Sequence, residues 1–547
     1  MYLADMTRLQ SLRSNPWVTL LVLCLGLFMN LLDTTIVYVA TPSMLTDLHA
    51  SLDAVLWVFN GYLLSFAILL IPAGRLGDLF GPKRLTLVGL ALFTAASAAC
   101  GLSTDASQLI AARVVQGMGG ALLMPQMLPF IAALFSADRR GAAFGVNGAV
   151  VGLSTVAGPV LGGFIVTNAD WRWIFYLNVP VGIIAFAAVL LLVPDLRPGR
   201  SHSFDPVGIV LASASLFAIV FGLIEGQRYS WSTITGALTV PEVIAGGVVL
   251  LALFVVWESR QREPLVPLRL FRLGDFAINN WIGVAIAFGM QAAFIPLTIY
   301  TQSVLGMSAL TSGLTFAPMS VAAGVVAPFA GRFTDRIGGR PILVAGLGLF
   351  AAGISWTAAL AAVGSSSWTF FVPMVVTGIG MGGVFAPSIT VAMRPIRTAD
   401  AGSASGVLNT TRQVGSAMGA AVMGAVLQNR LASLLPSDAA QAAQQLPVAA
   451  RAAFINGFAS AAGGNLEVGA GQAGHLALPA GIPAQLAAQI QALATQVFDN
   501  AYIAAMRPTV ALGMAVVLAG AASALLLERG WRRSRVPEVE AQPAEAA

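Results

Sequence analysis

Long apolar runs separated by short polar segments set the organisation of this 547-residue chain. Most runs reach the roughly 20 residues that an α-helix needs to cross a bilayer, so their length rather than their periodicity identifies them. We predict fourteen membrane-spanning helices, at about residues 17–40, 54–73, 84–103, 107–134, 142–165, 173–193, 206–224, 242–257, 276–300, 311–330, 342–362, 368–391, 405–428 and 507–527.

The composition predicts an all-α polytopic membrane protein. The chain is 57% hydrophobic and only 10% charged, whereas a soluble domain carries about 25% charged residues. The first apolar run has no small-residue cleavage site after it and is followed by many more runs, so we interpret it as a first span and not as a signal peptide. Cys24 and Cys100 lie inside apolar runs, which argues against a disulfide framework.

Basic residues orient the chain. With the amino terminus inside, twenty-two of the 29 Lys and Arg residues fall near the inner ends of the spans and five near the outer ends. This bias places both termini in the cytoplasm, and it accounts for the net charge of +5 without a nucleic-acid partner. The preference for Arg over Lys suggests a GC-rich coding genome, and hence a bacterial inner (cytoplasmic) membrane.

An internal repeat divides the chain. GRLGDLFGPK (74–83) recurs as GRFTDRIGGR (331–340), displaced by 257 residues, and GMGG (117–120) recurs at 380–383, displaced by 263. Parallel repeats around a central site are a transporter architecture. We therefore predict a six-helix bundle at 1–200, two inserted helices at 201–262 and a second six-helix bundle at 263–547.

One long segment, residues 429–506, is predicted to lie outside the membrane on the outer side. It is rich in Ala and Gln, with a Gly-rich middle. Leu486, Ile490, Leu493 and Val497 fall on one helical face, which predicts an amphipathic helix. That helix could cap the outer surface or the headgroups, or it could dock a partner protein; apart from such a partner we expect a monomer.

Two opposite charges interrupt the apolar runs at matching depth. Asp33 and Arg113 each lie about 10 Å below the outer surface, on spans that run in opposite directions. A lone charge there costs roughly 2.5–3.5 kcal/mol even on a lenient scale, so we predict that the two pair, either structurally or as part of an ion pathway. Because all three histidines lie in loops, Asp33 is the candidate proton carrier, and we expect it to face an internal cavity.

Motifs for nucleotide binding and catalysis are missing from the sequence. The only lysine, Lys83, follows Pro82, so there is no GxxxxGK[ST] phosphate loop. HExxH, paired CxxC and GxSxG elements are also missing. The sequence therefore predicts neither an enzyme nor a metal or cofactor site, and it leaves a proton gradient as the energy source.

The repeated turn is a candidate conformational switch. Its glycines allow a tight turn, and Asp78 could exchange charge contacts with the basic residues as the halves rock. Alternatively, the basic residues only enforce topology. The predicted switch residues are Gly74, Asp78, Gly81, Lys83 and Arg84, with Asp335 and Arg336 in the second copy.

Residues 148–163, GAVVGLSTVAGPVLGG, form a glycine-rich part of the fifth span. Small residues at this spacing could serve close helix packing, or they could form a seam that seals one side during transport. We expect one side of the helix to be lined by Gly148, Gly152, Gly158, Gly162 and Gly163, with Pro159 bending it.

Arg412 lies about 10 Å from the inner surface in the thirteenth span. It could reach lipid phosphates by snorkelling, or it could face a substrate cavity. The residues that we assign to that cavity are Tyr38, Trp57, Asn60, Tyr62, Gln116 and Arg412.

Together these stretches resemble the major facilitator superfamily, in particular its fourteen-span drug:H+ antiporter branch. The turn at 74–84 is similar to that family's motif A, RVVQGMGGALLMP (113–125) to motif B, and GPVLGG (158–163) to motif C. LDTTIVYVATP, WRWIFYLNVPVG and RQVGSAMG also look typical of the branch, except that Tyr38 stands where Asn is usual. The resemblance implies the superfamily fold and a role for Arg113 in proton handling.

The resulting hypothesis is a proton-coupled antiporter that exports lipophilic or cationic drugs. Proton uptake from outside would neutralise Asp33 and release the drug, and proton release inward would reset the site. Its partners would be small molecules, protons and membrane lipids. Export of a lipid or a self-made metabolite by the same fold is the alternative, and a membrane-embedded receptor is a further one that predicts no transport.

Overall fold

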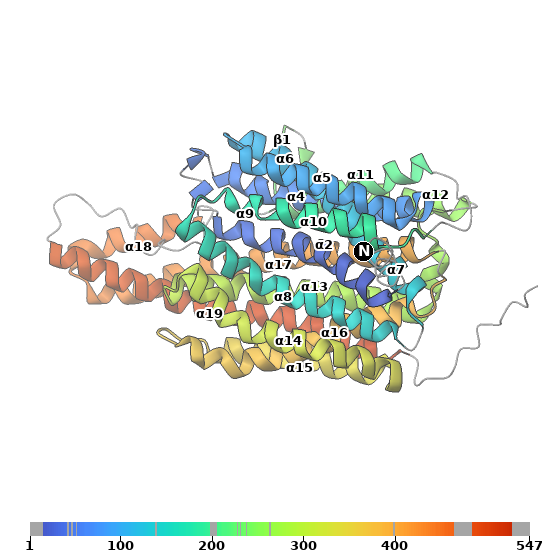
Figure 1. The fold of residues 1–547 in the computed structure, drawn as a ribbon. Helices are drawn as coiled ribbons and strands as arrows, with labels where there is room; N and C mark the ends of the chain where they lie inside the picture. Colours follow the sequence, from blue (N-terminus) through green and yellow to red (C-terminus); the bar gives the residue numbers. More distant parts are fainter. Residues whose placement is uncertain are drawn as a thin grey trace, which may run out of the picture.

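The computed structural model describes residues 15–40, 43–44, 47–50, 52–136, 139–196, 205–226, 228–229, 231–236, 238–261, 264–397, 400–463 and 484–527. Long helices lie side by side through the molecule, with short connections at both ends (Figure 1). Twelve helices in the described part of the chain are long and apolar enough to cross a membrane. The predicted all-α, multi-pass architecture is confirmed.

Helix starts in the amino-terminal half coincide with capping residues. Asn15 and Asp105 accept backbone N–H groups in the first turns of α2 and α6, and Pro82 stands in the first turn of α5, where its missing N–H costs nothing. The elements are α2 (Pro16–Ile36), η1 (Val37–Ala40), α4 (Leu52–Phe80), α5 (Pro82–Leu102), α6 (Ala106–Leu123), η2 (Met124–Gln126), α7 (Met127–Leu134), α8 (Arg140–Asn168), α9 (Trp173–Tyr176) and α10 (Asn178–Leu192).

Two helices follow this half, α11 (Pro206–Glu225) and α12 (Val240–Arg260). A small antiparallel hairpin of β1 (Thr233–Thr235) and β2 (Leu238–Thr239) connects them, with Thr233 opposite Thr239. Thr239 and Glu242 form a capping box that starts α12. Helix α11 packs against α12 and against α4 of the amino-terminal half.

The carboxy-terminal half contains the remaining elements. Each of the fourteen predicted spans falls on a helix, although α8 and α17 are not among the twelve described helices that meet the length and hydropathy criteria. The elements are η3 (Leu268–Arg272), α13 (Gly274–Ile299), η4 (Tyr300–Val304), α14 (Ala309–Ile337), α15 (Gly339–Leu360), η5 (Ser367–Phe370), α16 (Phe371–Met393), α17 (Ala401–Ala442), η7 (Ala443–Gln445), α18 (Val448–Gly463) and α19 (Ala484–Ala524).

The repeat is visible in the backbone. Gly81 and Gly338, 257 residues apart, both adopt positive φ, at 92° and 87°, in the turns that precede α5 and α15. Only glycine takes this conformation without strain, which explains its recurrence in the repeated turn.

The GMGG strings are not at equivalent positions. Gly119 approaches the backbone N of Phe93 on α5, and Gly380 makes the same approach to Phe350 on α15. Phe93 and Phe350 are 257 residues apart, whereas Gly119 and Gly380 are 261 apart. The matching letters, displaced by 263 residues, are therefore two residues out of register with the structural repeat, because contacts between the helices set that register.

The described part of the predicted outer segment (429–506) is helical and extends beyond the bundle. Helices α17 and α19 run on without interruption beyond the bundle, and α18 packs against α17 there (Figure 1, left). The fourteenth span consequently belongs to a helix that starts at Ala484 rather than near residue 507. The predicted amphipathic face is confirmed, since Ile490 and Val497 are buried in the hydrophobic core that this projection shares with the bundle.

Candidate functional site

A buried ion pair joins α2 to α6 in the amino-terminal half. Nη1 of Arg113 donates to Oδ2 of Asp33 at 2.5 Å, and the two side chains are 1% and 0% exposed. The predicted pairing of these charges is confirmed. Removal of either partner alone would leave an uncompensated buried charge, at a cost of about 3–5 kcal/mol.

Two amides complete the coordination of the carboxylate. Oδ1 of Asp33 accepts from Nε2 of Gln116 and from Nδ2 of Asn178, each at 2.9 Å. Asn178 in turn donates to Oγ of Ser97 at 3.1 Å. Sequence reasoning did not single out Asn178, although it noted the stretch WRWIFYLNVPVG. An amide at the start of an apolar helix was the available signal.

The guanidinium of Arg113 also has several partners besides Asp33. It donates to Oε1 of Gln116 at 2.7 Å and to the carbonyl of Val58 at 3.2 Å. Its Cζ lies 4.2 Å from the centroid of the Tyr62 ring, within cation–π distance. Helices α2, α4, α6 and α10 therefore all contribute to one polar cluster inside an apolar half.

The glycines of GMGG bring α6 close enough to its neighbours for this cluster to form. A Cβ on Gly117 would overlap the carbonyl of Tyr62 on α4, and one on Gly119 would lie 2.6 Å from the backbone N of Phe93 on α5. A Cβ on Gly120 would overlap the side chain of Asn30 on α2. Three glycines thus permit three close helix contacts.

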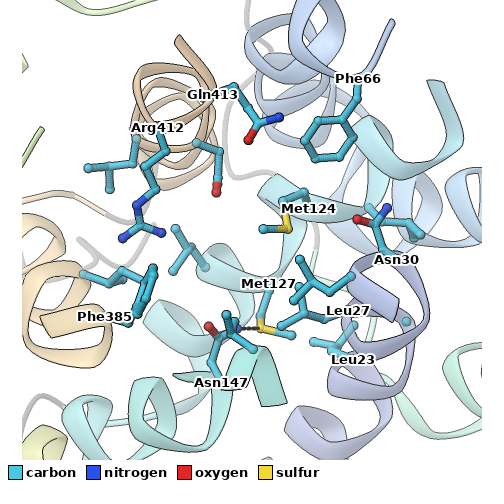
Figure 2. A pocket seen from close by; sticks show the side chains of 18 of the residues that line it. Leu23, Leu27, Asn30, Phe66, Met124, Met127, Asn147, Phe385, Arg412 and Gln413 are labelled. Atoms are coloured by element: carbon cyan, nitrogen blue, oxygen red, sulfur yellow. Dashed lines mark hydrogen bonds between the residues drawn. The ribbon is translucent and has the colours of Figure 1, made fainter. Parts of the chain in front are cut away.

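A separate cavity of about 260 Å³ lies between the two halves (Figure 2). Its walls are mostly aliphatic, methionine and aromatic side chains, which come from α2, α4, α5, α6, η2, α7, α8 and α10 on one side and from α13, α16 and α17 on the other. Methionines are adaptable packing partners, which suits ligands of varied shape. The polar residues of the lining are Asn30, Thr86, Asn147, Gln291, Asn409, Arg412, Gln413 and Ser416.

Arg412 reaches from α17 into this cavity beside Phe385 (Figure 2). The sequence left open whether Arg412 reaches lipid phosphates or faces a cavity, and in the structure its side chain faces the cavity. The expectation that Asp33 faces the cavity is wrong, because its carboxylate is fully covered. On α2 the lining runs from Val22 to Leu31, and Asp33 lies just beyond it.

Depth also separates the other predicted cavity residues from this cavity. Tyr62 and Gln116 belong to the cluster around Arg113. Trp57 packs against Phe221 of α11 at 6.1 Å between ring centroids, and Asn60 is half-buried on α4. The side chain of Tyr38 lies outside the described residues.

Two side chains connect the cavity to the ion pair. Phe66 lines the cavity and stacks on Tyr62, with ring centroids 5.9 Å apart, and Tyr62 lies under Arg113. Asn30 also lines the cavity, and its Nδ2 and the Tyr62 hydroxyl both lie against Gly120. A ligand that displaces Phe66 or Asn30 would thus disturb the packing around Arg113.

The switch residue Asp78 joins the two halves at the other end of α4. Its Oδ1 accepts from the backbone N of Gly402 at 3.1 Å, and its Oδ2 accepts from N and Oγ of Ser403, each at 3.0 Å. A carboxylate at this helix start also complements the dipole of α17. Gly74 has almost no room for a side chain, since a Cβ there would lie close to the carbonyl of Gly402.

The second copy of the turn makes the related contact in reverse. Gly331 on α14 approaches the carbonyl of Gly141 at the start of α8, and a Cβ on Gly141 would overlap Oδ2 of Asp335. In each half, the aspartate of the repeated turn therefore lies against the start of a helix of the other half. These contacts hold the two halves together at the end where the repeated turns lie.

The basic switch residues have different neighbours from those expected. Nζ of Lys83 donates to the carbonyls of Leu190 and Val193 at the end of α10, at 3.0 and 2.7 Å, where a cation also complements the helix dipole. Arg84 and Arg336 are exposed. The interhelix bonds of Asp78 to α17 thus go to backbone and hydroxyl groups.

The glycine-rich stretch of α8 faces two neighbours and not one. Gly148, Gly152 and Gly163 pack on α14 of the other half, where added Cβ atoms would lie 3.3 to 3.5 Å from their neighbours. Gly158 instead packs on Thr35 of α2. The predicted single face is wrong for Gly158, because ten residues at 100° each rotate it well away from Gly148. Gly162 is buried on α8, and the side chain of Pro159 lies outside the described residues.

Comparisons with known proteins agree on one family. The sequence profile of the Major Facilitator Superfamily matches residues 23–420. The chain is 36% identical over 546 residues to the tetracenomycin C resistance and export protein of Streptomyces glaucescens, covering 99% of this chain and 97% of that protein. It is 33% identical to the multidrug resistance protein Stp of Mycobacterium tuberculosis, over 76% of this chain and 77% of that one. The solved structure of the human organic anion transporter MFSD10 shares the fold, with a TM-score of 0.56 at 14% identity over 74% of this chain and 92% of the other.

Proposed function

The chain belongs to the major facilitator superfamily and is a multi-pass membrane transporter rather than an enzyme, and on that premise we propose that it exports lipophilic small molecules by proton antiport. We place it in the inner membrane with both termini in the cytoplasm. The relatives named for antibiotic or multidrug export support the direction of transport.

The buried Asp33–Arg113 pair is the observation that supports proton coupling. A carboxylate with donors at both oxygens is stable as an anion only while Arg113, Gln116 and Asn178 stay in place. If Arg113 moves away, protonation relieves the lone buried charge. The pair can therefore exchange a bound proton for the partner cation.

The pair and the cavity are distinct, so the coupling has to be indirect. Substrate in the cavity contacts Phe66 and Asn30, which pack against Tyr62, and Tyr62 supports Arg113. In this scheme protonation of Asp33 from outside frees Arg113 and favours release of substrate outward. When the contacts of Asp78 and Asp335 open on the inner side, Asp33 releases its proton to the cytoplasm.

Export of a self-made metabolite is the second candidate for the same transport cycle. One relative that aligns over nearly the whole chain is named for both resistance to and export of tetracenomycin C. In that name, export of one compound and resistance to it belong to the same protein. The two candidates differ in substrate and share the coupling site.

The test is transport in proteoliposomes with two readouts for Asp33→Asn. One is pH-gradient-driven movement of ethidium or fluorescein, and the other is exchange of the same dye between the two sides without a gradient. We expect the variant to lose driven transport and to keep exchange, because the proton carrier is gone while the cavity remains. Asp170→Asn, an exposed acid, is the matched control.

The double variant Asp33→Asn/Arg113→Gln guards against misfolding, since it leaves no orphan charge in the core. It too should retain exchange without driven transport. Equal driven transport in the wild type and both variants would show that the coupling proton binds elsewhere. Loss of exchange in a well-folded double variant would show that the pair is needed for the cavity itself.

A further inference from the structure

The lining of the cavity between the halves contains a positive charge and no negative charge among its described residues. Among the residues that line it, Arg412 is the one with an ionisable side chain, and none of the lining residues is an Asp or Glu. The other polar groups there are amides and hydroxyls, including Asn147 and Gln413. The described lining therefore has a positive centre within a mostly apolar wall (Figure 2).

Arg412 differs from Arg113, which also lies within a span. Arg113 has a carboxylate, an amide and a carbonyl as acceptors. Nε of Arg412 is buried and has no hydrogen-bond partner among the described residues, and its Cζ lies 5.5 Å from the ring centroid of Phe385. An unpaired guanidinium in such a place is costly, and an anionic ligand would relieve that cost.

The side chain is held in position by its surroundings. A Cβ built on Gly283 of α13 would lie 3.3 Å from Cγ and 3.6 Å from Nε of Arg412, so the stem lies directly on that glycine. The neighbouring Thr411 donates to Oδ1 of Asn280 at 3.0 Å, which fixes α17 against α13. A ligand would therefore meet a preorganised group.

We propose that Arg412 binds the acidic group of the substrate, and that this transporter selects amphipathic anions: a carboxylate, sulfonate or acidic phenol on an apolar body. This rests on the proposed export function and names its substrate class. The planar guanidinium matches a two-oxygen anion, while Phe66, Met124 and Phe385 cover the apolar body. A cationic drug would meet the same guanidinium with no carboxylate in the described lining to offset it.

Binding of two related dyes tests the proposal without any proton gradient. Fluorescein, an anion, and rhodamine 123, a cation, share the xanthene ring system. Their affinities for the full-length protein in lipid nanodiscs are measured by fluorescence anisotropy at pH 7.5. A charge-assisted contact is worth about 1.5–3 kcal/mol, so we expect fluorescein to bind about 10- to 100-fold more tightly than rhodamine 123.

Three variants assign the preference to Arg412. Arg412→Gln should lose about 10-fold or more in fluorescein affinity and leave rhodamine 123 unchanged or improved, whereas Arg412→Lys should recover part of the loss. Arg430→Gln, an exposed arginine on the same helix, is the control and should bind like the wild type. Asn147→Asp keeps Arg412 and adds a competing carboxylate to the cavity wall, so it should also weaken fluorescein.

The outcomes separate this proposal from proton coupling. Wild-type protein that binds fluorescein no more tightly than rhodamine 123, or not at all, overturns it. Equal losses for both dyes in Arg412→Gln and Asn147→Asp also overturn it, because the arginine then serves only the shape of the cavity. If fluorescein binding depends on Arg412 but no gradient-driven transport is observed, the anion site is supported. Only the proposed antiport mechanism is then contradicted.

Discussion

Asp78 offers a direct test of how the two halves are held together. Its carboxylate accepts three hydrogen bonds from Gly402 and Ser403 of the opposite half. Asp78→Asn keeps the shape but removes the charge and turns an NH₂ group toward one of these donors. Because the site is partly solvated, we estimate a loss of about 2–3 kcal/mol, which is a factor of about 30–150 in the equilibrium. An open state populated at about 1% would rise to roughly a quarter or more of the molecules.

Pulsed electron paramagnetic resonance measures this change as a distance. Spin labels at Ser136→Cys and Arg394→Cys, both exposed and on opposite halves at this end, report the separation, and the native Cys24 and Cys100 are buried. Asp78→Asn should add a population at longer distance. Asp105→Asn, which makes the same change of carboxylate to amide at a helix cap within one half, should not. Identical distance distributions for wild type and Asp78→Asn would refute the reasoning and assign closure to the glycine contacts.

Three further changes probe packing around the two sites. Gly117→Val should destabilise the protein by about 1–3 kcal/mol or more, because the added side chain overlaps Tyr62. The melting temperature in nanodiscs should fall, and an unchanged melting temperature would contradict the close helix contact. Gly283→Ala should lower fluorescein affinity several-fold by displacing the stem of Arg412, with total charge unchanged, and unaltered affinity would count against that positioning. Tyr502→Phe removes a buried hydrogen bond to an α13 carbonyl and should cost about 1–2 kcal/mol in chemical denaturation, where no change would indicate that water replaces the hydroxyl.

The sequence predicted the features that depend only on distance along a helix, namely where helices lie in the chain and how deep a residue is in the membrane. Apolar run length predicted a helix at each of the fourteen spans, although not the start of α19. Counting residues from the membrane surface brought Asp33 and Arg113 to the same depth, where they pair. Such inferences succeed because helical rise is fixed at 1.5 Å per residue. The repeated turn was predicted for a similar reason, since a φ near 90° strongly favours glycine.

Features that depend on how helices face each other were harder to predict. The predicted cavity residues lie too near the end of the bundle that holds the Asp33–Arg113 pair, because depth alone does not say where the halves separate. Asn178 completes the Asp33 site from a helix 145 residues away, and only tertiary packing brings it there. The two-residue error at GMGG has the same origin, since α6 and α16 take their register from contacts with α5 and α15.

Helices α17 and α19, at 42 and 41 residues, have a mechanical consequence. At 1.5 Å per residue each is about 60 Å long, roughly twice the hydrocarbon thickness of a bilayer. The far end of α17 lies about 45 Å along the helix from Arg412, so a 5° tilt at the cavity would move that tip by about 4 Å. A small tilt of α17 at the cavity would therefore produce a displacement of several ångströms at the projection, so a label on α18 is expected to detect rearrangements of the bundle without touching the cavity.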